Sequence, residues 1–245
     1  MKFNDFYFEE SINDKNLFNA VFLAGGPGSG KTLISNLAFG GEGTVTINSD
    51  MFTEMMFKRD AIPFVFDPKK KELYARQQEI RNKARDLASQ RIAHAVNGML
   101  PIVVDGTGRN FDKIKRLRES LNAVGYDTYM VFVNTSLDAA RERNQQRARK
   151  IDDKMVVQMW HDVQDNLGHF QDLFGGENFI IVDNSELLTD DDVKKLEIDL
   201  TRKVRKFLQT PVHNPIGQEI LKDLKERGKQ YMSDLVDLDK EQFKL

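Results

Sequence analysis

Short apolar runs alternate with longer amphipathic segments along the chain. Five of these runs have the length and the β-branched or aromatic character of buried strands, and they lie at residues 20–24, 44–48, 102–105, 129–133 and 179–182. The segments between them place apolar residues at helical spacing. This alternation predicts an α/β fold in which a parallel, doubly wound five-stranded sheet carries helices on both faces.

The apolar stripes also indicate where the chain divides. Long helices are predicted over Glu72–Asn97 and Asp152–Phe174, and a further helix after Thr189 carries a stripe that ends at Phe207. Residues 210–215 include two prolines and look like a short linker, after which a charged amphipathic tail helix runs to Leu245. We therefore expect an N-terminal arm over residues 1–19, one domain over 20–208 and a C-terminal helical extension over 209–245.

Composition narrows the class of protein. The 245 residues contain 36 Lys and Arg against 38 Asp and Glu, so a net charge of −2 provides no global field toward nucleic acid or a membrane. The chain has no cysteine, which excludes thiolate metal sites and a catalytic thiol. The first residues do not resemble a targeting peptide, and no apolar run approaches the length of a membrane span. We expect a cytoplasmic protein without membrane contact.

A phosphate-binding motif follows the first predicted strand. The stretch Gly25-Gly26-Pro27-Gly28-Ser29-Gly30-Lys31-Thr32 fits G-x-x-x-x-G-K-[ST] at every fixed position, with a strand before it and a helix after it. Glycines let backbone N–H groups wrap a polyphosphate, and the following helix points its N-terminus at the anion. Lys31 is predicted to reach the β- and γ-phosphates, and the Thr32 hydroxyl to bind Mg²⁺. The sequence thus predicts a P-loop NTPase fold that binds ATP or GTP with Mg²⁺.

Two acids follow the next two predicted strands. Asp50 comes after residues 44–48, where it is placed either to accept the proton of an acceptor hydroxyl or merely to cap the next helix, as Ser49 would. Asp105 ends residues 102–105 and has two open roles: to hold Mg²⁺ beside Thr32, or to face the acceptor together with Thr107. Ligands gather at the carboxyl ends of strands in open α/β sheets, so both acids are expected near the phosphate loop.

A basic segment lies between the fourth and fifth predicted strands. Residues 141–150 hold four arginines and Lys150 against a single Glu142, a pattern that favours an anionic target over a solvated face. Arg143 and Arg147 are four residues apart and fall on one helix face. We expect a lid at about 138–152, whose arginines neutralise charge on the transferred phosphoryl group.

These motifs together resemble those of P-loop kinases of the polynucleotide 5′-hydroxyl kinase and zeta-toxin type. The resemblance covers Val21–Asn184 and rests on the phosphate loop, Asn48-Ser49-Asp50, Val103-Val104-Asp105-Gly106-Thr107 and Arg143–Ile151. It implies that Asp50 is the general base, that Arg147 contacts the donor phosphates with Arg143 beside it, and that Asn184 lies where the donor base is held.

The resemblance is incomplete at the acceptor site. Polynucleotide kinases carry an arginine shortly after the base Asp, whereas here Met51, Phe52 and Thr53 follow. The next basic residues are Lys58 and Arg59. Two interpretations of this region are open. In the first, its Met and Phe side chains form an apolar shelf for a base, and nearby arginines bind phosphate; in the second, the same Met and Phe side chains simply pack in the core. The shelf would comprise Met51, Phe52, Met55, Met56 and Phe57, and the arginines would be Arg59, Arg76 and Arg81.

Three functions fit these features. The first is a kinase that transfers the γ-phosphoryl group to a hydroxyl of a nucleic-acid end, a nucleotide or a nucleotide-sugar. The second is a nucleotide-dependent ATPase or switch whose C-terminal helix contacts a protein partner or self-associates, although Gly106 stands where such proteins usually carry a water-activating glutamate. The third is a zeta-type toxin kinase that acts on a cell-wall precursor.

Overall fold

The computed structural model describes residues 16–40, 43–64, 69–146, 151–186 and 190–242. Within these residues five strands form one sheet in the order β2-β3-β1-β4-β5, and every neighbouring pair is parallel. The strands are β1 (Asn19–Ala24), β2 (Val45–Ile47), β3 (Ile102–Asp105), β4 (Asp127–Asn134) and β5 (Phe179–Asp183). The predicted parallel, five-stranded α/β fold is confirmed.

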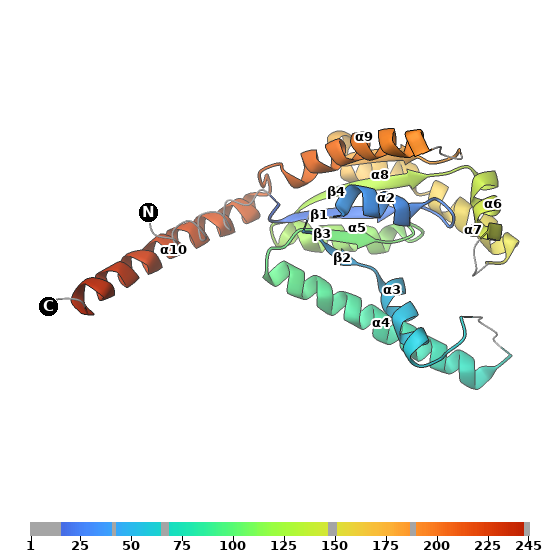
Figure 1. Ribbon diagram of the computed structural model, residues 1–245, viewed down its shortest axis with the longest axis horizontal. Coiled ribbons are helices and arrows are strands. Elements are labelled where there is room, and N and C mark those ends of the chain that lie inside the picture. Colours follow the sequence, from blue (N-terminus) through green and yellow to red (C-terminus); the bar gives the residue numbers. More distant parts are fainter. Residues whose placement is uncertain (1–15, 41–42, 65–68, 147–150, 187–189, 243–245) are drawn as a thin grey trace.

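Strand register brings the functional segments to one edge of the sheet. Leu23 of β1 pairs with Asp105 of β3, and Ile47 of β2 pairs with Val104. The carboxyl ends of β1, β2 and β3 therefore lie side by side, since all three strands run in the same direction. The loops that follow these strands meet at that edge (Figure 1).

Side chains alternate between the two faces of the central strand, and each face has its own core. Phe22 packs with a cluster that includes Phe132 and Phe170 and is covered by α4 (Lys71–Asn97), α5 (Phe111–Ala123) and α8 (Leu167–Phe174). Leu23 packs with the opposite cluster, which is covered by α2 (Lys31–Phe39) and α9 (Asp190–Leu208). Figure 1 shows α2 and α9 on one side of the sheet and α4 and α5 on the other. Burial on both faces explains the uninterrupted apolar runs of the strands.

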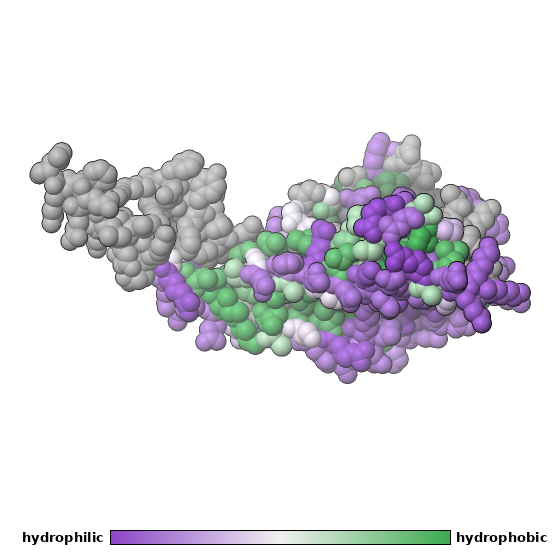
Figure 2. Space-filling model, turned by 90° about the horizontal axis from the view of Figure 1, so that it is seen from below, coloured by the Kyte–Doolittle hydropathy of each residue, from purple (hydrophilic) through white to green (hydrophobic). Residues whose placement is uncertain are grey.

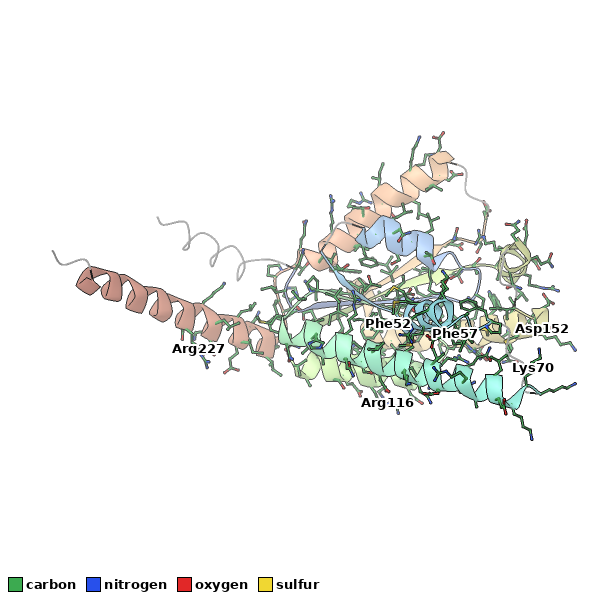
Figure 3. The ribbon with its side chains drawn as sticks, turned by 60° about the horizontal axis from the view of Figure 1, so that its bottom comes forward. Phe52, Phe57, Lys70, Arg116, Asp152 and Arg227 are labelled. Atoms are coloured by element: carbon green, nitrogen blue, oxygen red, sulfur yellow. The ribbon has the colours of Figure 1, made fainter. Side chains whose placement is uncertain are left out.

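Helix α3 (Ser49–Arg59) and α4 form a helical pair beside β2, with a small core of their own (Figure 3). Phe57 is 0% exposed and Met56 is buried, and both pack against Ile80. The core interpretation is therefore correct for these two residues. Met51 and Met55 are instead exposed, so only part of the predicted apolar shelf is open to a ligand.

Two predicted segments are organised differently in the structure. The helix expected over Asp152–Phe174 is broken into α7 (Asp153–Gln164) and α8. At the break the Asn166 side chain donates to the carbonyl oxygens of Gly108 and Arg109 at 2.9 and 3.0 Å, which ties this turn to the loop after β3. The expected linker at 210–215 is packed on the domain, because Val212 is buried in the same core cluster as Phe18 and Tyr126.

Helix α10 (Pro215–Gln242) extends away from the rest of the molecule (Figure 1). Its first turn is held closely, since a Cβ on Gly217 would lie 2.3 Å from the Gly125 carbonyl oxygen. Seen from below, apolar residues gather beside this junction (Figure 2). Three large apolar side chains are exposed just before β3, just before β4 and at the start of α10: Leu100, Val124 and Ile216. In the described part of the chain, no helix combines the length and the apolar character needed to cross a membrane.

Candidate nucleotide site

The loop between β1 and α2 has the backbone conformation that its glycines predict. Gly28 and Gly30 have φ values of 75° and 84°, in the left-handed region that glycine adopts without strain. A Cβ on Gly25 would lie 2.6 Å from the Val133 carbonyl oxygen, and one on Gly28 would lie 2.7 Å from that of Ala140. Residues 25–29 are buried, so Pro27 and Ser29 belong to a loop fixed on several sides. Only glycine fits at these turns and close approaches.

The last two residues of the motif, Lys31 and Thr32, begin α2; Lys31 is half-buried and Thr32 is exposed. Lys31 Nζ donates to the carbonyl oxygens of Gly25 and Gly26 at 2.6 and 3.2 Å, which keeps the ammonium over the loop. Thr32 is exposed on the first turn of α2. Helix N-termini favour anions because their first N–H groups lack partners within the helix. The tight glycine turns, this helix end, Lys31 and the exposed hydroxyl fit a nucleoside triphosphate with Mg²⁺.

Asn48 joins the second and third strands of the site. Its Oδ1 accepts hydrogen bonds from the backbone N–H groups of Asp50 and Met51 at 2.8 and 3.2 Å, so Asn48 caps α3. Its Nδ2 donates to Asp105 Oδ2 at 2.6 Å. The alternative in which Asp50 caps the helix is therefore wrong: Asp50 lies inside the first turn and is exposed.

The Asp105 carboxyl experiences the charges of Lys31 and Asp50. Burial raises the pKa of its carboxyl above the ordinary value; Lys31 and the hydrogen bond from Asn48 act against this, and Asp50 raises it further. The Asp105 carboxyl therefore lies within electrostatic reach of both Lys31 and Asp50 at the edge of the sheet. Carboxylate and hydroxyl oxygens suit Mg²⁺. Among the described residues no group of three or more His, Asp or Glu side chains forms a metal site by itself.

The loop after β3 is joined to the phosphate loop through the backbone. The N–H of Gly25 donates to the Thr107 carbonyl oxygen at 3.3 Å, and the N–H of Gly106 donates to that of Leu23 at 3.0 Å. Gly108 has a φ of 78°, and a Cβ added to it would lie 3.0 Å from the Cβ of Ala24. Thr107 is half-buried beside the loop, and its acceptor-facing role stays a prediction.

Asn184 and Arg143 contact the outer side of the phosphate loop. Asn184 is 4% exposed, and its Nδ2 donates to the Ser29 carbonyl oxygen at 2.8 Å. This side chain was predicted to hold the donor base; the structure shows it supporting the loop, and a base contact stays a prediction. Arg143 directs Nη1 toward the Gly28 carbonyl oxygen at 3.2 Å. The helix α6 (Leu137–Gln146) therefore presents Arg143 to the loop backbone.

The remainder of the predicted lid is only partly described. Arg147 lies outside the described residues, together with Lys150. Arg141, which the sequence grouped with an unpaired basic cluster, forms an ion pair with Asp153 of α7, with Nε and Oδ1 2.7 Å apart. Buried Asn144 exchanges two hydrogen bonds with the backbone of Ile151, at 2.7 and 3.0 Å. Tertiary pairing thus accounts for part of the charge that sequence analysis assigned to an anion.

Arg59 and Arg76 have acidic partners on the α3–α4 pair. Arg59 Nε lies 2.6 Å from Asp60 Oδ1, and Arg76 lies 3.4 Å from Asp60 Oδ2 and 2.8 Å from Glu79 Oε2. Arg59 is nine residues after Asp50, about 14 Å along the helix. An acceptor phosphate would therefore compete with Asp60 and Glu79 for these arginines, and their contact with an acceptor stays a prediction.

Sequence reasoning missed two residues that shape the site. Asn48 was noted only as part of a motif, although an Asn directly before Ser49-Asp50 is a recognisable helix-cap signal. Trp160 of α7 donates its indole N–H to the Thr135 carbonyl oxygen at 2.8 Å, and its Cα is 3.9 Å from a Cβ built on Gly26. No local pattern indicates that contact, because α7 is far from the phosphate loop in sequence.

Solved structures share this fold. A candidate kinase from Chloroflexus aurantiacus matches with a TM-score of 0.52 and 16% identity, over 78% of this chain and 98% of that one. A protein of the PezAT chromosomal toxin–antitoxin system of Streptococcus pneumoniae matches with a TM-score of 0.51 and 14% identity, over 96% and 98%. A chain of the Pnkp1/Rnl/Hen1 RNA repair complex matches with a TM-score of 0.50 and 14% identity, over 64% of this chain and 48% of that one. Identities this low establish likeness of fold alone.

Sequence comparison assigns the family. No curated protein sequence matches the chain. Residues 21–167, more than half of the chain, match the AAA domain family. That stretch begins in β1, contains the phosphate loop and both strand-end acids, and ends at the start of α8. The chain belongs to the AAA domain family, and its fold is that of a P-loop kinase.

Proposed function

We propose that the protein is a Mg²⁺-dependent kinase that transfers the γ-phosphoryl group of ATP or GTP to a hydroxyl group. One observation carries this proposal: Asp105, at the end of β3, accepts a hydrogen bond from Asn48, which also caps the helix that carries Asp50, and the Asp105 carboxyl experiences the charges of both Asp50 and Lys31 on the phosphate loop. A transferase needs an anion cradle and a carboxylate for the acceptor on the same side of the sheet. This edge supplies both.

Each residue has a separate part in the proposed reaction. Backbone N–H groups of the second half of the phosphate loop and of the first turn of α2, together with the Lys31 ammonium, bind the donor phosphates. Thr32 and Asp105 would hold Mg²⁺, which when bound neutralises phosphate charge. Asp50 orients the acceptor hydroxyl and takes its proton as the oxygen attacks the γ-phosphorus and the bond to the β–γ bridging oxygen breaks. The products are a phosphorylated acceptor and the nucleoside diphosphate.

The acceptor is proposed as a nucleic-acid end, a nucleotide or a nucleotide-sugar. The exposed Met51 and Met55 follow Asp50 on α3, one turn apart on the same helix face, and provide an apolar surface for a base. The fold likeness to chains of an RNA repair complex and of a toxin–antitoxin system motivates the inclusion of both nucleic-acid and zeta-type cell-wall acceptors. Thr107 and Asp105 form the opposite side of the proposed acceptor site.

We further propose how the chain is divided, where the protein works and which segment contacts a partner. Residues 20–208 form the catalytic domain, after an arm over 1–19 and before an extension over 209–245. The cytoplasm supplies its nucleotide donors and Mg²⁺. Helix α10, which leaves the domain at Pro215, is the segment proposed to contact a protein partner or a second copy.

The central test is a transfer assay with γ-labelled ATP and GTP. The acceptors are 5′-hydroxyl DNA and RNA, nucleosides, nucleotides and nucleotide-sugars, each tested with and without Mg²⁺. The proposal expects label on one acceptor class and no transfer without Mg²⁺. Release of free phosphate at the same rate with every acceptor, and no labelled product, would instead identify an ATPase or switch.

Substitution of Asp50 tests the proposed base. Asp50→Asn is expected to reduce transfer at least a hundredfold, because the hydroxyl proton loses its acceptor, while ATP affinity changes less than threefold. Asp86→Asn, at an exposed position of α4, is the matched control and should leave both quantities unchanged. Lys31→Ala should abolish transfer through loss of donor binding. Normal transfer by Asp50→Asn would remove the residue from the mechanism.

A further inference from the structure

Arg143 connects three segments that are distant in sequence. Its Nη1 donates to the Asn184 carbonyl oxygen at 2.7 Å and faces the Gly28 carbonyl oxygen and Thr135 Oγ1 at 3.2 and 3.3 Å. Its Nη2 donates to the Glu186 carbonyl oxygen at 2.8 Å. One guanidinium therefore joins the phosphate loop, the end of β4 and the end of β5. These contacts use the fork of donors that arginine has and lysine lacks.

Asn184 and Thr135 extend these contacts. The Thr135 hydroxyl donates to the same Asn184 carbonyl oxygen at 3.1 Å, and the Asn184 N–H donates to the Asn134 carbonyl oxygen at 2.9 Å. The Asn184 side chain then reaches the Ser29 carbonyl oxygen at 2.8 Å. A Cβ on Gly30 would lie 2.3 Å from Asn184 Nδ2, so the loop backbone packs directly against the side-chain amide of Asn184.

We propose that Arg143 is a positioning residue that, together with Asn184, fixes two successive peptide planes of the phosphate loop. Arg143 acts on the Gly28 carbonyl group, and Asn184 acts on that of Ser29. In a planar trans peptide the C=O and the next N–H point in opposite directions. Holding both carbonyl oxygens on the outer side therefore sets the directions of the N–H groups of Ser29 and Gly30. The Ser29 N–H donates to the Gly26 carbonyl oxygen at 3.3 Å and so closes the turn of the loop. The Gly30 N–H belongs to the proposed phosphate cradle.

This inference rests on the proposed nucleotide binding and differs from a direct contact with the transferred group. A residue that shapes the cradle affects every nucleotide whose β-phosphate enters the loop. An arginine that touches only the γ-phosphate affects ATP but not ADP. Arg143 as a positioning residue also acts before any nucleotide binds, since its partners are backbone carbonyl groups.

Equilibrium binding provides the first test. Arg143→Lys keeps the charge but loses the fork, and it should weaken ATP and ADP binding by the same factor, about tenfold. Arg116→Lys is the control, because Arg116 is exposed on α5 and lies at the lower side of the molecule in Figure 3, away from the loop. Its affinities should match those of the wild type. Loss of ATP affinity with unchanged ADP affinity would overturn the proposal in favour of a γ-phosphate contact.

Hydrogen exchange of the protein without nucleotide provides the second test. In Arg143→Lys the amides of residues 25–30 should exchange at least fivefold faster than in wild type and Arg116→Lys, while the amides of β4 exchange as in wild type. Unchanged exchange of residues 25–30 would refute the positioning role. The exchange experiment needs no nucleotide, so it tests the positioning role separately from the proposed function. Failure of the proposed function would appear instead as a wild-type protein that binds neither ATP nor GTP.

A second variant covers the case in which Arg143→Lys does not fold. Thr135→Val preserves side-chain shape but removes the hydroxyl that lies between Arg143 and the Asn184 carbonyl oxygen. It should accelerate exchange of residues 25–30 and weaken ATP and ADP equally, by a smaller factor than Arg143→Lys. A Thr135→Val protein with wild-type exchange and wild-type affinities would contradict the proposed network.

Discussion

Asn48 shows how one side chain can serve two segments of a site. Its carbonyl oxygen caps α3, and its amide nitrogen donates to Asp105. The helix that carries Asp50 is thus tied to the strand end that carries Asp105. Replacement of Asn48 separates these roles, because Ser also caps helices but cannot reproduce the amide donor.

We predict that Asn48→Ala lowers the free energy of unfolding by about 1–2 kcal/mol through loss of the cap. Asn48→Ser should remain within about 0.5 kcal/mol of wild type, and in the proposed assay it should still lose transfer activity, since Asp105 loses its partner. Urea unfolding and the transfer assay provide the two readouts. Equal destabilisation by Ala and Ser would show that capping is not the source of the stability.

Asp105 provides a test of stability against pH. A carboxyl whose pKa is raised by burial makes the folded state less stable once it ionises, so this penalty is absent at low pH and grows as the pH rises above the ordinary carboxyl value. We predict that Asp105→Asn raises the midpoint of thermal unfolding at pH 7 and that the difference from wild type vanishes near pH ~3. A midpoint lowered at pH 7 would contradict the burial penalty.

At the scale of elements, Asn214 determines how α10 joins the domain. Its Oδ1 accepts from the Ile216 N–H at 3.0 Å, and its Nδ2 donates to the carbonyl oxygens of Asn122 and Tyr126 at 2.8 and 3.1 Å. Pro215 follows at the first helical position, where a missing N–H costs nothing. The segment expected to be a linker is therefore an anchored helix start.

We predict that Asn214→Ala lowers the free energy of unfolding by about 2 kcal/mol, from the lost cap and two hydrogen bonds. It should also speed amide exchange in the first turns of α10. Asn122→Ala is the control, since it keeps the backbone oxygen that Asn214 contacts. Similar loss in both variants would indicate that the anchor lies elsewhere in this junction.

Helical spacing of apolar residues predicted the extent of α4 correctly, but it did not reveal the break between α7 and α8. The apolar stripe correctly predicted a helix from residue 72 to Asn97, within one residue of the observed start. The stripe from Asp152 to Phe174 continues across the break because both short helices pack on the same core. The turn at Asn166 depends on its hydrogen bonds to the loop after β3, which a periodic pattern does not contain.

At the scale of the whole molecule, strand order concentrates the site at one edge of the sheet, and α7 packs over it from a distant part of the sequence. The chain contains one tryptophan, Trp160, which is half-buried beside Gly26 and Thr135. Its fluorescence therefore reports on the phosphate loop without any label.

We predict that titration with ATP or ADP and Mg²⁺ shifts the emission intensity of Trp160 by at least ~10%, because loop contacts change the surroundings of the indole. Lys31→Ala should abolish the saturable change. An unaltered spectrum at nucleotide concentrations where binding is detected by calorimetry would show that α7 does not sense the loop.

Sequence alone determined the strands, the sheet class and the phosphate loop, because burial on two faces and tight glycine turns leave local patterns. It also placed Asp105 at the end of one strand and Asp50 shortly after the neighbouring strand. Only the tertiary structure decided what each polar side chain contacts. Asp153 forms an ion pair with Arg141, and Asp60 and Glu79 pair with Arg59 and Arg76. Asn184, expected where the donor base is held, donates a hydrogen bond to the backbone of the phosphate loop. Such partners come from distant segments, and their identity depends on strand order and helix packing rather than on spacing along the chain.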